Sequence, residues 1–202
     1  MVNKRILSRC WGAAATIVED NVLKLRQIIA VGSLFSVIAG GGAIAGEQTV
    51  QVHKLSAEGI GASVGTITFK DSHHGMTVTP NLHSLPPGNH AFHIHENPDC
   101  GPGLKDGKMV AGLKAGGHYD PSGAGHGHKH GHGHGGHGMV PHGDLPDITA
   151  DAGGTATKAV MSDKLKLAQI QGRSIMVHRY GTNDPGKPKG GGPRFACGVI
   201  EK

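Results

Sequence analysis

The sequence predicts an all-β fold, an eight-stranded Greek-key β-barrel or sandwich with two long functional loops. Beyond residue 45, short β-type runs alternate with turns that are rich in glycine and proline. No stretch of this part keeps apolar residues at helical spacing over three turns, so helices should be minor or absent. Many short strands separated by such turns are typical of sandwiches and barrels.

Eight segments are expected to be strands, and a long region with little strand character, residues 97–154, separates the first four from the last four. A structureless region of this length in a compact domain is normally functional or disordered. A second long loop, residues 179–194, is rich in Gly, Pro and Lys. The expected strands are Thr49 to Leu55, Gly65 to Lys70, Met76 to Thr79, Asn89 to His95, Thr155 to Val160, Leu165 to Ile170, Ser174 to His178 and Phe195 to Ile200.

Residues 1–45 are expected to be an N-terminal extension plus a signal peptide, which leaves one domain over residues 46–202. Lys24 and Arg26 precede an apolar stretch, and Ala43-Ile44-Ala45 has the small-x-small pattern of a cleavage site. The residues ahead of Lys24 suggest that the true start lies downstream of Met1. The alternative is an uncleaved anchor, because residues 28–45 are barely long enough to span a membrane. Their glycines and the A-x-A ending favour cleavage and export.

The charge and cysteine content narrow the possible functions. The chain carries a formal net charge of +5, but it has no basic run and only 3% aromatic residues, which disfavours a nucleic-acid groove. Removal of the leader would also remove Cys10 and leave only Cys100 and Cys197. A single pair in an exported chain indicates one disulfide, the alternative being two unrelated buried thiols.

Several histidines are candidates for a metal site. His93 and His95 leave the same face of a predicted strand and could converge on one ion, although a structural or surface pair is the simpler reading. His90 should point to the opposite face, as a hydrogen-bonded core histidine. His118, among glycines, and His178, at a strand end, would complete a set of four nitrogens suited to Cu(II).

Five motifs, in order, resemble those of copper,zinc superoxide dismutases of the bacterial periplasmic type. They are GNHAFHIH at 88–95, GHYDP at 117–121, GDLP at 143–146, IMVH at 175–178 and GPRFACGVI at 192–200. The resemblance extends from Thr49 to the C-terminus. It implies an enzyme that disproportionates superoxide to O₂ and hydrogen peroxide through a copper redox cycle, with copper and zinc as cofactors.

The resemblance also assigns roles to individual residues. Arg194 would steer and dock superoxide, His118 would bridge the two metals and return a proton, and the Cys100–Cys197 disulfide would tie a loop to the barrel. The implied copper ligands are His93, His95, His118 and His178.

The zinc half matches the family less closely. Asp144 in GDLP carries over directly, but His142 stands two residues before it, whereas the family has three. The remaining ligand would come from a Gly/His tract at 125–138, where spacing from His118 favours His126. The other histidines of the tract are His128, His130, His132, His134 and His137.

One second-shell residue departs from the family pattern. The family's bridging aspartate, which holds a copper and a zinc ligand, normally lies four residues past the last copper histidine, and Thr182 occupies that position. Asp184 is the nearest carboxylate and could serve after a small shift of the loop.

A non-catalytic copper or zinc buffer on the same barrel is the alternative function. It predicts a lost copper ligand or a lost arginine, and neither is missing. The surplus tract histidines could capture metal when it is scarce, or the tract could be a solvated spacer.

The expected partners are superoxide and a second copy in a homodimer, with no nucleic acid and no stable membrane association after cleavage. The expected compartment is the periplasm.

Overall fold

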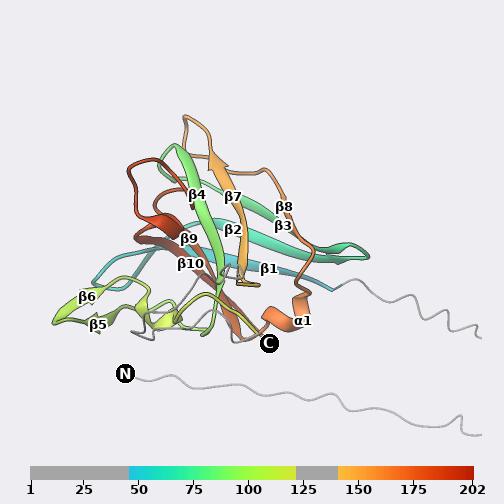
Figure 1. The fold of residues 1–202 in the computed structure, drawn as a ribbon, viewed down its shortest axis with the longest axis horizontal. Helices are drawn as coiled ribbons and strands as arrows, with labels where there is room; N and C mark the ends of the chain where they lie inside the picture. The colour runs from blue at the N-terminus through green and yellow to red at the C-terminus, as the bar shows by residue number, and fades with distance from the viewer. Residues whose placement is uncertain (1–45, 122–140) are drawn as a thin grey trace, which may run out of the picture. The chain divides into compact units, whose positions relative to one another are not determined.

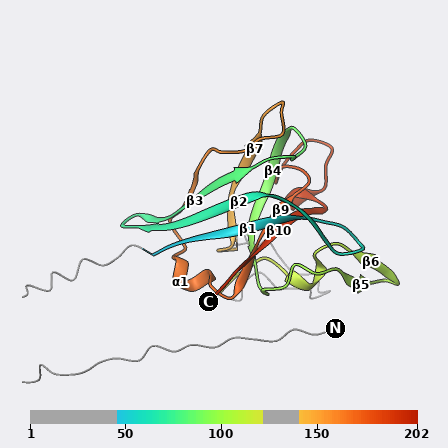
Figure 2. The same ribbon diagram turned by 180° about the vertical axis from the view of Figure 1, so that it is seen from behind.

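Eight antiparallel strands form one sheet that curls into a nearly closed barrel (Figures 1 and 2). The computed structural model describes residues 46–121 and 141–202. The strand order is β7-β4-β9-β10-β1-β2-β3-β8, and the two end strands approach each other. The strands of the sheet are β1 (Glu47–Leu55), β2 (Ile60–Ser72), β3 (Gly75–Leu82), β4 (Gly88–His95), β7 (Asp144–Ala150), β8 (Val160–Ser162), β9 (Arg173–His178) and β10 (Arg194–Ile200).

The connections make this sheet a Greek key. Tight hairpins join β1, β2 and β3, but β4 pairs with β7 and β9 and does not pair with β3. The chain therefore crosses one end of the barrel after β3 and crosses back between β7 and β8. The predicted eight-stranded Greek-key barrel is confirmed.

Strand β4 is buried on both faces, and its two faces carry different kinds of side chain. Phe92 and Ile94 on one face pack in the apolar core, and both are 0% exposed. The alternate residues His93 and His95 are also buried, although they point away from that core. The long segment after β4 covers them.

That segment contains a small hairpin, β5 (Gly103–Lys105) and β6 (Lys108–Val110), followed by the 3₁₀ turn η1 (Leu113–Ala115). Another 3₁₀ turn, η2 (Lys189–Gly191), lies in the loop between β9 and β10. Helices are minor in the described part of the chain, as predicted. No helix there is long and apolar enough to cross a membrane.

Two of the predicted strands are wrong. In the first, Thr155 lies in a turn closed by the Asp151 carboxylate, Ala156 makes only an isolated bridge with Leu82 of β3, and continuous pairing with β3 begins at Val160. The segment Leu165 to Ile170 contains a short helix, α1 (Leu167–Ile170), whose buried residues are three apart, a spacing that suits a helical turn. An Asp71 carboxylate oxygen accepts from the Leu167 N–H at 2.9 Å and fixes its start.

Strand β7 was not predicted at all, because it falls in the region given little strand character. Its Pro146 argues against a central strand. In the structure β7 is an edge strand of the sheet, and an edge strand tolerates a residue without an N–H. The predicted leader (1–45) and the Gly/His tract from residue 125 to 138 lie outside the described residues.

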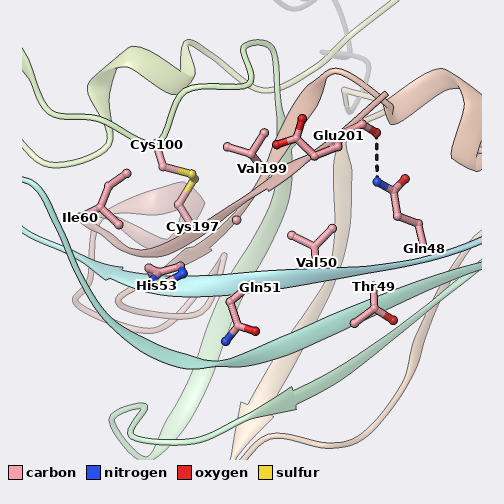
Figure 3. A pocket seen from close by; sticks show the side chains of 11 residues that line it. Gln48, Thr49, Val50, Gln51, His53, Ile60, Cys100, Cys197, Val199 and Glu201 are labelled. Carbon is pink, nitrogen blue, oxygen red and sulfur yellow. Dashed lines mark hydrogen bonds between the residues drawn. A yellow bond between two sulfur atoms is a disulfide. The ribbon is translucent and has the colours of Figure 1, made fainter. Parts of the chain in front are cut away.

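The predicted disulfide is present between Cys100 and Cys197, which are 97 residues apart in the sequence. It fastens the segment after β4 to β10, and it packs in a small cluster with Leu55, Ala115 and Met176. Figure 3 shows it beside a groove on the outer face of β1 and β10, where Gln48 donates to the Glu201 carbonyl.

Replacing both cysteines by serine should lower the free energy of unfolding by about 2–4 kcal/mol, because the crosslink restricts the unfolded chain over a long loop. Urea denaturation measures the change. Reduction of the unmodified protein is the matched control and should produce a similar loss. Equal stability of the oxidised protein and the double variant would contradict this expectation.

Candidate metal centre

Four histidine rings converge at one end of the barrel. His93 and His95 come from β4, His178 ends the neighbouring β9, and His118 comes from the segment after η1. One ring nitrogen from each of the four lies within 4.8 Å of the others. The β4–β9 ladder, with Phe92 opposite Val177, sets His178 beside the β4 pair.

Backbone carbonyls fix the orientation of two of these rings. Nδ1 of His95 lies 3.0 Å from the Gly116 carbonyl oxygen, and Nδ1 of His178 lies 2.9 Å from that of Gly192. A carbonyl can only accept, so each Nδ1 carries the proton and each Nε2 keeps its lone pair. Both Nε2 atoms, and Nδ1 of His93, are buried without a hydrogen-bond partner among the described residues. Three unpaired lone pairs in a buried cluster fit a metal ion.

His118 is placed to serve two sites. Its Nδ1 lies 2.7 Å from an Asp144 carboxylate oxygen, which leaves Nε2 for the four-histidine cluster. Asp144 opens β7 and stands opposite His93 in the β4–β7 ladder. One imidazole therefore separates the histidine cluster from a carboxylate.

The buried histidines of the cluster are neutral. Burial lowers the pKa of His93 and of His95 to about 2, with the neighbouring charges of His118 and Arg194 adding to the effect. Burial also lowers the pKa of His178, to about 4. Loss of hydration penalises the charged imidazolium, so the lone pairs are available at neutral pH.

Backbone hydrogen bonds hold His118 in place. The Tyr119 N–H donates to the Ile94 carbonyl at 2.8 Å, and the Gly143 N–H donates to the Tyr119 carbonyl at 2.7 Å. The Ile94 N–H donates to the Gly143 carbonyl at 2.8 Å and closes the set. A β-carbon at Gly143 would lie 2.6 Å from the Ile94 oxygen, so this close approach requires glycine.

Arg194 lies beside the histidine cluster at the start of β10. Its guanidinium donates to the carbonyls of Gly112 and Gly116, on either side of η1. The Gly116 carbonyl also accepts from His95, so it links the cation to a cluster ring. Gly112 has φ of 62°, and a β-carbon there would come 2.7 Å from Leu55 Cδ1. Burial lowers the pKa of Arg194, but a guanidinium stays charged in proteins.

The carboxylate side of His118 contains two more candidates. Nδ1 of His142 is buried without a hydrogen-bond partner within the described ranges, and it lies 3.4 Å from an Asp120 carboxylate oxygen. That distance is within ion-pair range, but the two groups do not form a hydrogen bond. His126 and the rest of the tract lie outside the described residues.

The structure also places the other residues singled out in the sequence. His90 is a buried core histidine as predicted, with Nδ1 2.7 Å from the His178 carbonyl oxygen and Nε2 2.7 Å from that of Pro86. Asp184 accepts from the Gly181 N–H within its own loop, and Thr182 contacts Asp147.

Sequence reasoning missed the carbonyls that orient the rings. Those of Gly112, Gly116 and Gly192 act through main-chain atoms, which no residue type marks. The only sequence signal for them is that all three residues are glycine, a residue type that permits the positive φ found at each position.

Comparison with known proteins agrees with this geometry. The family model for copper/zinc superoxide dismutase matches residues 63–200. Superoxide dismutase [Cu-Zn] 1 of Salmonella typhimurium (strain LT2) is 48% identical over 158 residues, which cover 76% of this chain and 86% of that protein.

Two solved structures are similar as well. The Cu/Zn superoxide dismutase from Brucella abortus is 44% identical with a TM-score of 0.66, over 77% of this chain and 100% of that one. The monomeric copper, zinc superoxide dismutase from Salmonella enterica is 40% identical with a TM-score of 0.64, over the same shares. The chain belongs to the copper/zinc superoxide dismutase family.

Proposed function

We propose that this protein is an enzyme that converts two superoxide anions and two protons into O₂ and hydrogen peroxide. The observation that carries the proposal is the cluster of four imidazoles beside a fixed guanidinium, in which three rings have a buried nitrogen without a hydrogen-bond partner among the described residues. Imidazole nitrogens are good ligands for copper. His93 through Nδ1, and His95, His118 and His178 through Nε2, would hold it.

Bound copper supplies the chemistry of alternate one-electron oxidation and reduction of superoxide. The protein supplies the rest. Arg194 attracts the small anion and offers several N–H donors to it. The carbonyls of Gly112 and Gly116 keep the guanidinium at the cluster. His118 can take up a proton at Nε2 whenever that atom is not bound to copper, and release it again.

Zinc would bind on the other side of His118, through His118 Nδ1, Asp144 and His142, with His126 of the tract as the fourth ligand. Three nitrogens and one carboxylate oxygen form a tetrahedral donor set that zinc accepts. The buried Nδ1 of His142, which makes no hydrogen bond to any described residue, supports its inclusion.

A superoxide assay on the protein loaded with copper and zinc, with metal analysis alongside, tests the function. We expect one copper and one zinc per chain and fast disproportionation. Protein that binds both metals but leaves superoxide untouched would contradict the proposal and support a metal-buffering role.

Arg194→Ala should lower the second-order rate by roughly tenfold or more and weaken its salt dependence, because the attraction is electrostatic. The copper content should stay unchanged, since no metal ligand is lost. Lys54→Ala is a matched control, because it removes a cation that lies over the Phe195 ring and is not bonded to the cluster. Equal losses in the two variants would contradict a local role for Arg194.

The part of copper binding that depends on His93, His95 and His178 should change little between neutral pH and about pH 5, because protons compete with metal only below a ligand's pKa. The pKa values of about 2 for His93 and His95 and about 4 for His178 lie below that range. Ordinary histidines, with a pKa of about 6.5, would lose copper there.

Stability should depend on pH as well. In the unfolded chain His93, His95 and His178 take up protons near pH 6.5, so the free energy of unfolding should fall as the pH drops below it. Spectrophotometric copper titration at several pH values, with thermal melts, measures both effects.

We also propose that the chain is exported to the periplasm, loses residues 1–45 and forms a homodimer. The disulfide and the leader pattern support export, since disulfides persist in oxidising compartments. N-terminal sequencing and light scattering of the periplasmic protein should give Gly46 as the first residue and twice the mass of the mature chain. An N-terminus before Ala43 would contradict the proposed cleavage. A mass of one chain would contradict the proposed homodimer.

A further inference from the structure

The loop between β9 and β10, residues 179–193, determines the orientation of one cluster ring. Its Gly192 carbonyl accepts from Nδ1 of His178, and the loop leads directly into Arg194. A shift of this loop would therefore turn His178 and displace the guanidinium together.

Strand β7 holds this loop from outside. The Thr182 N–H donates to one carboxylate oxygen of Asp147 at 2.8 Å, and the Thr182 hydroxyl donates to the other at 2.5 Å. Both groups are half-buried. Hydrogen bonds to a carboxylate are about twice as strong as neutral ones, and a two-point contact also fixes direction.

Backbone hydrogen bonds connect Thr182 to the Gly192 end of the loop. The Gly190 N–H donates to the Thr182 carbonyl at 3.0 Å, and the Tyr180 N–H donates to the Gly191 carbonyl at 3.0 Å. On the other side, the Ala91 N–H of β4 donates to the Tyr180 carbonyl at 2.7 Å. The contacts therefore run from Asp147 through Thr182 and Gly190 to the carbonyl that orients His178.

We propose that Asp147 is a positioning residue for His178, and that its hydrogen bonds with Thr182 keep the 179–193 loop in place whether or not zinc is bound. The contacts just described use no residue of the zinc set. Asp184 supports the loop from within, since its carboxylate accepts from the Gly181 N–H at 2.9 Å. The inference rests on the proposed function only for the assignment of His178 as a copper ligand.

The test is hydrogen exchange of backbone amides 179–193, followed by mass spectrometry, in metal-free and zinc-loaded protein. The unmodified protein should show equal protection of the loop in both states. Thr182→Val removes the hydroxyl donor, and Asp147→Ala removes both acceptors. Each variant should speed exchange of the metal-free loop, roughly tenfold or more for Asp147→Ala, because the lost bonds involve a charged acceptor.

Three comparisons separate positioning from general destabilisation. Thr182→Ser keeps the donor and should restore protection. Thr68→Val removes a similar hydroxyl contact, the one with Thr49 on the β1–β2 face, and should leave the loop unchanged. The copper(II) visible and paramagnetic resonance spectra should change in Thr182→Val and recover in Thr182→Ser, since His178 would turn.

A metal-free loop that exchanges much faster than the zinc-loaded loop would overturn the proposal, and so would variants that leave the loop equally protected. Hydrogen exchange needs neither bound copper nor activity. An inactive protein would therefore contradict the proposed function and leave the hydrogen-exchange result for the 179–193 loop unaffected.

Discussion

Strand β4 is hydrogen-bonded to β9 on one side and to β7 on the other, and these two registers position most of the metal centre. The first sets His178 beside His93 and His95, and the second sets Asp144 opposite His93. The core face of β4 is filled by Phe92 and Ile94, both fully buried. A one-residue slip would exchange these faces and place imidazoles in the apolar core, so packing enforces the register.

The lone pairs also need fixed directions, and main-chain carbonyls provide them. The Gly116 carbonyl accepts from His95 and from Arg194, so it joins a ring of the cluster to the cation that would attract the substrate. The Gly192 carbonyl accepts from His178 and so orients that ring, and it lies ten residues past Thr182, which Asp147 holds. Such fixed donors and acceptors reduce the reorganisation that a reaction at the centre requires.

The long segments around the centre are tied to the barrel at points that do not depend on the Gly/His tract. Tyr119 and Gly143 bond to each other and to Ile94, and the disulfide fastens the start of the first segment to β10. The second loop is fastened by a carboxylate on β7, where the family resemblance suggested a carboxylate on the loop. Thr182 stands at the position where the family has its bridging aspartate, and here it donates to the carboxylate of Asp147.

The sequence by itself determined the barrel, most of its strands, the disulfide and the four clustered histidines, because alternation, turn residues and motif order are local signals. It did not reveal β7, whose Pro146 is tolerated only because the strand lies at a sheet edge, nor the helix at Leu167, which Asp71 starts from a distant strand. The tertiary structure alone decided which nitrogen of each ring faces the cluster and which carboxylate holds Thr182. Those choices depend on hydrogen bonds between segments far apart in the chain, and residue types in sequence do not encode such pairings.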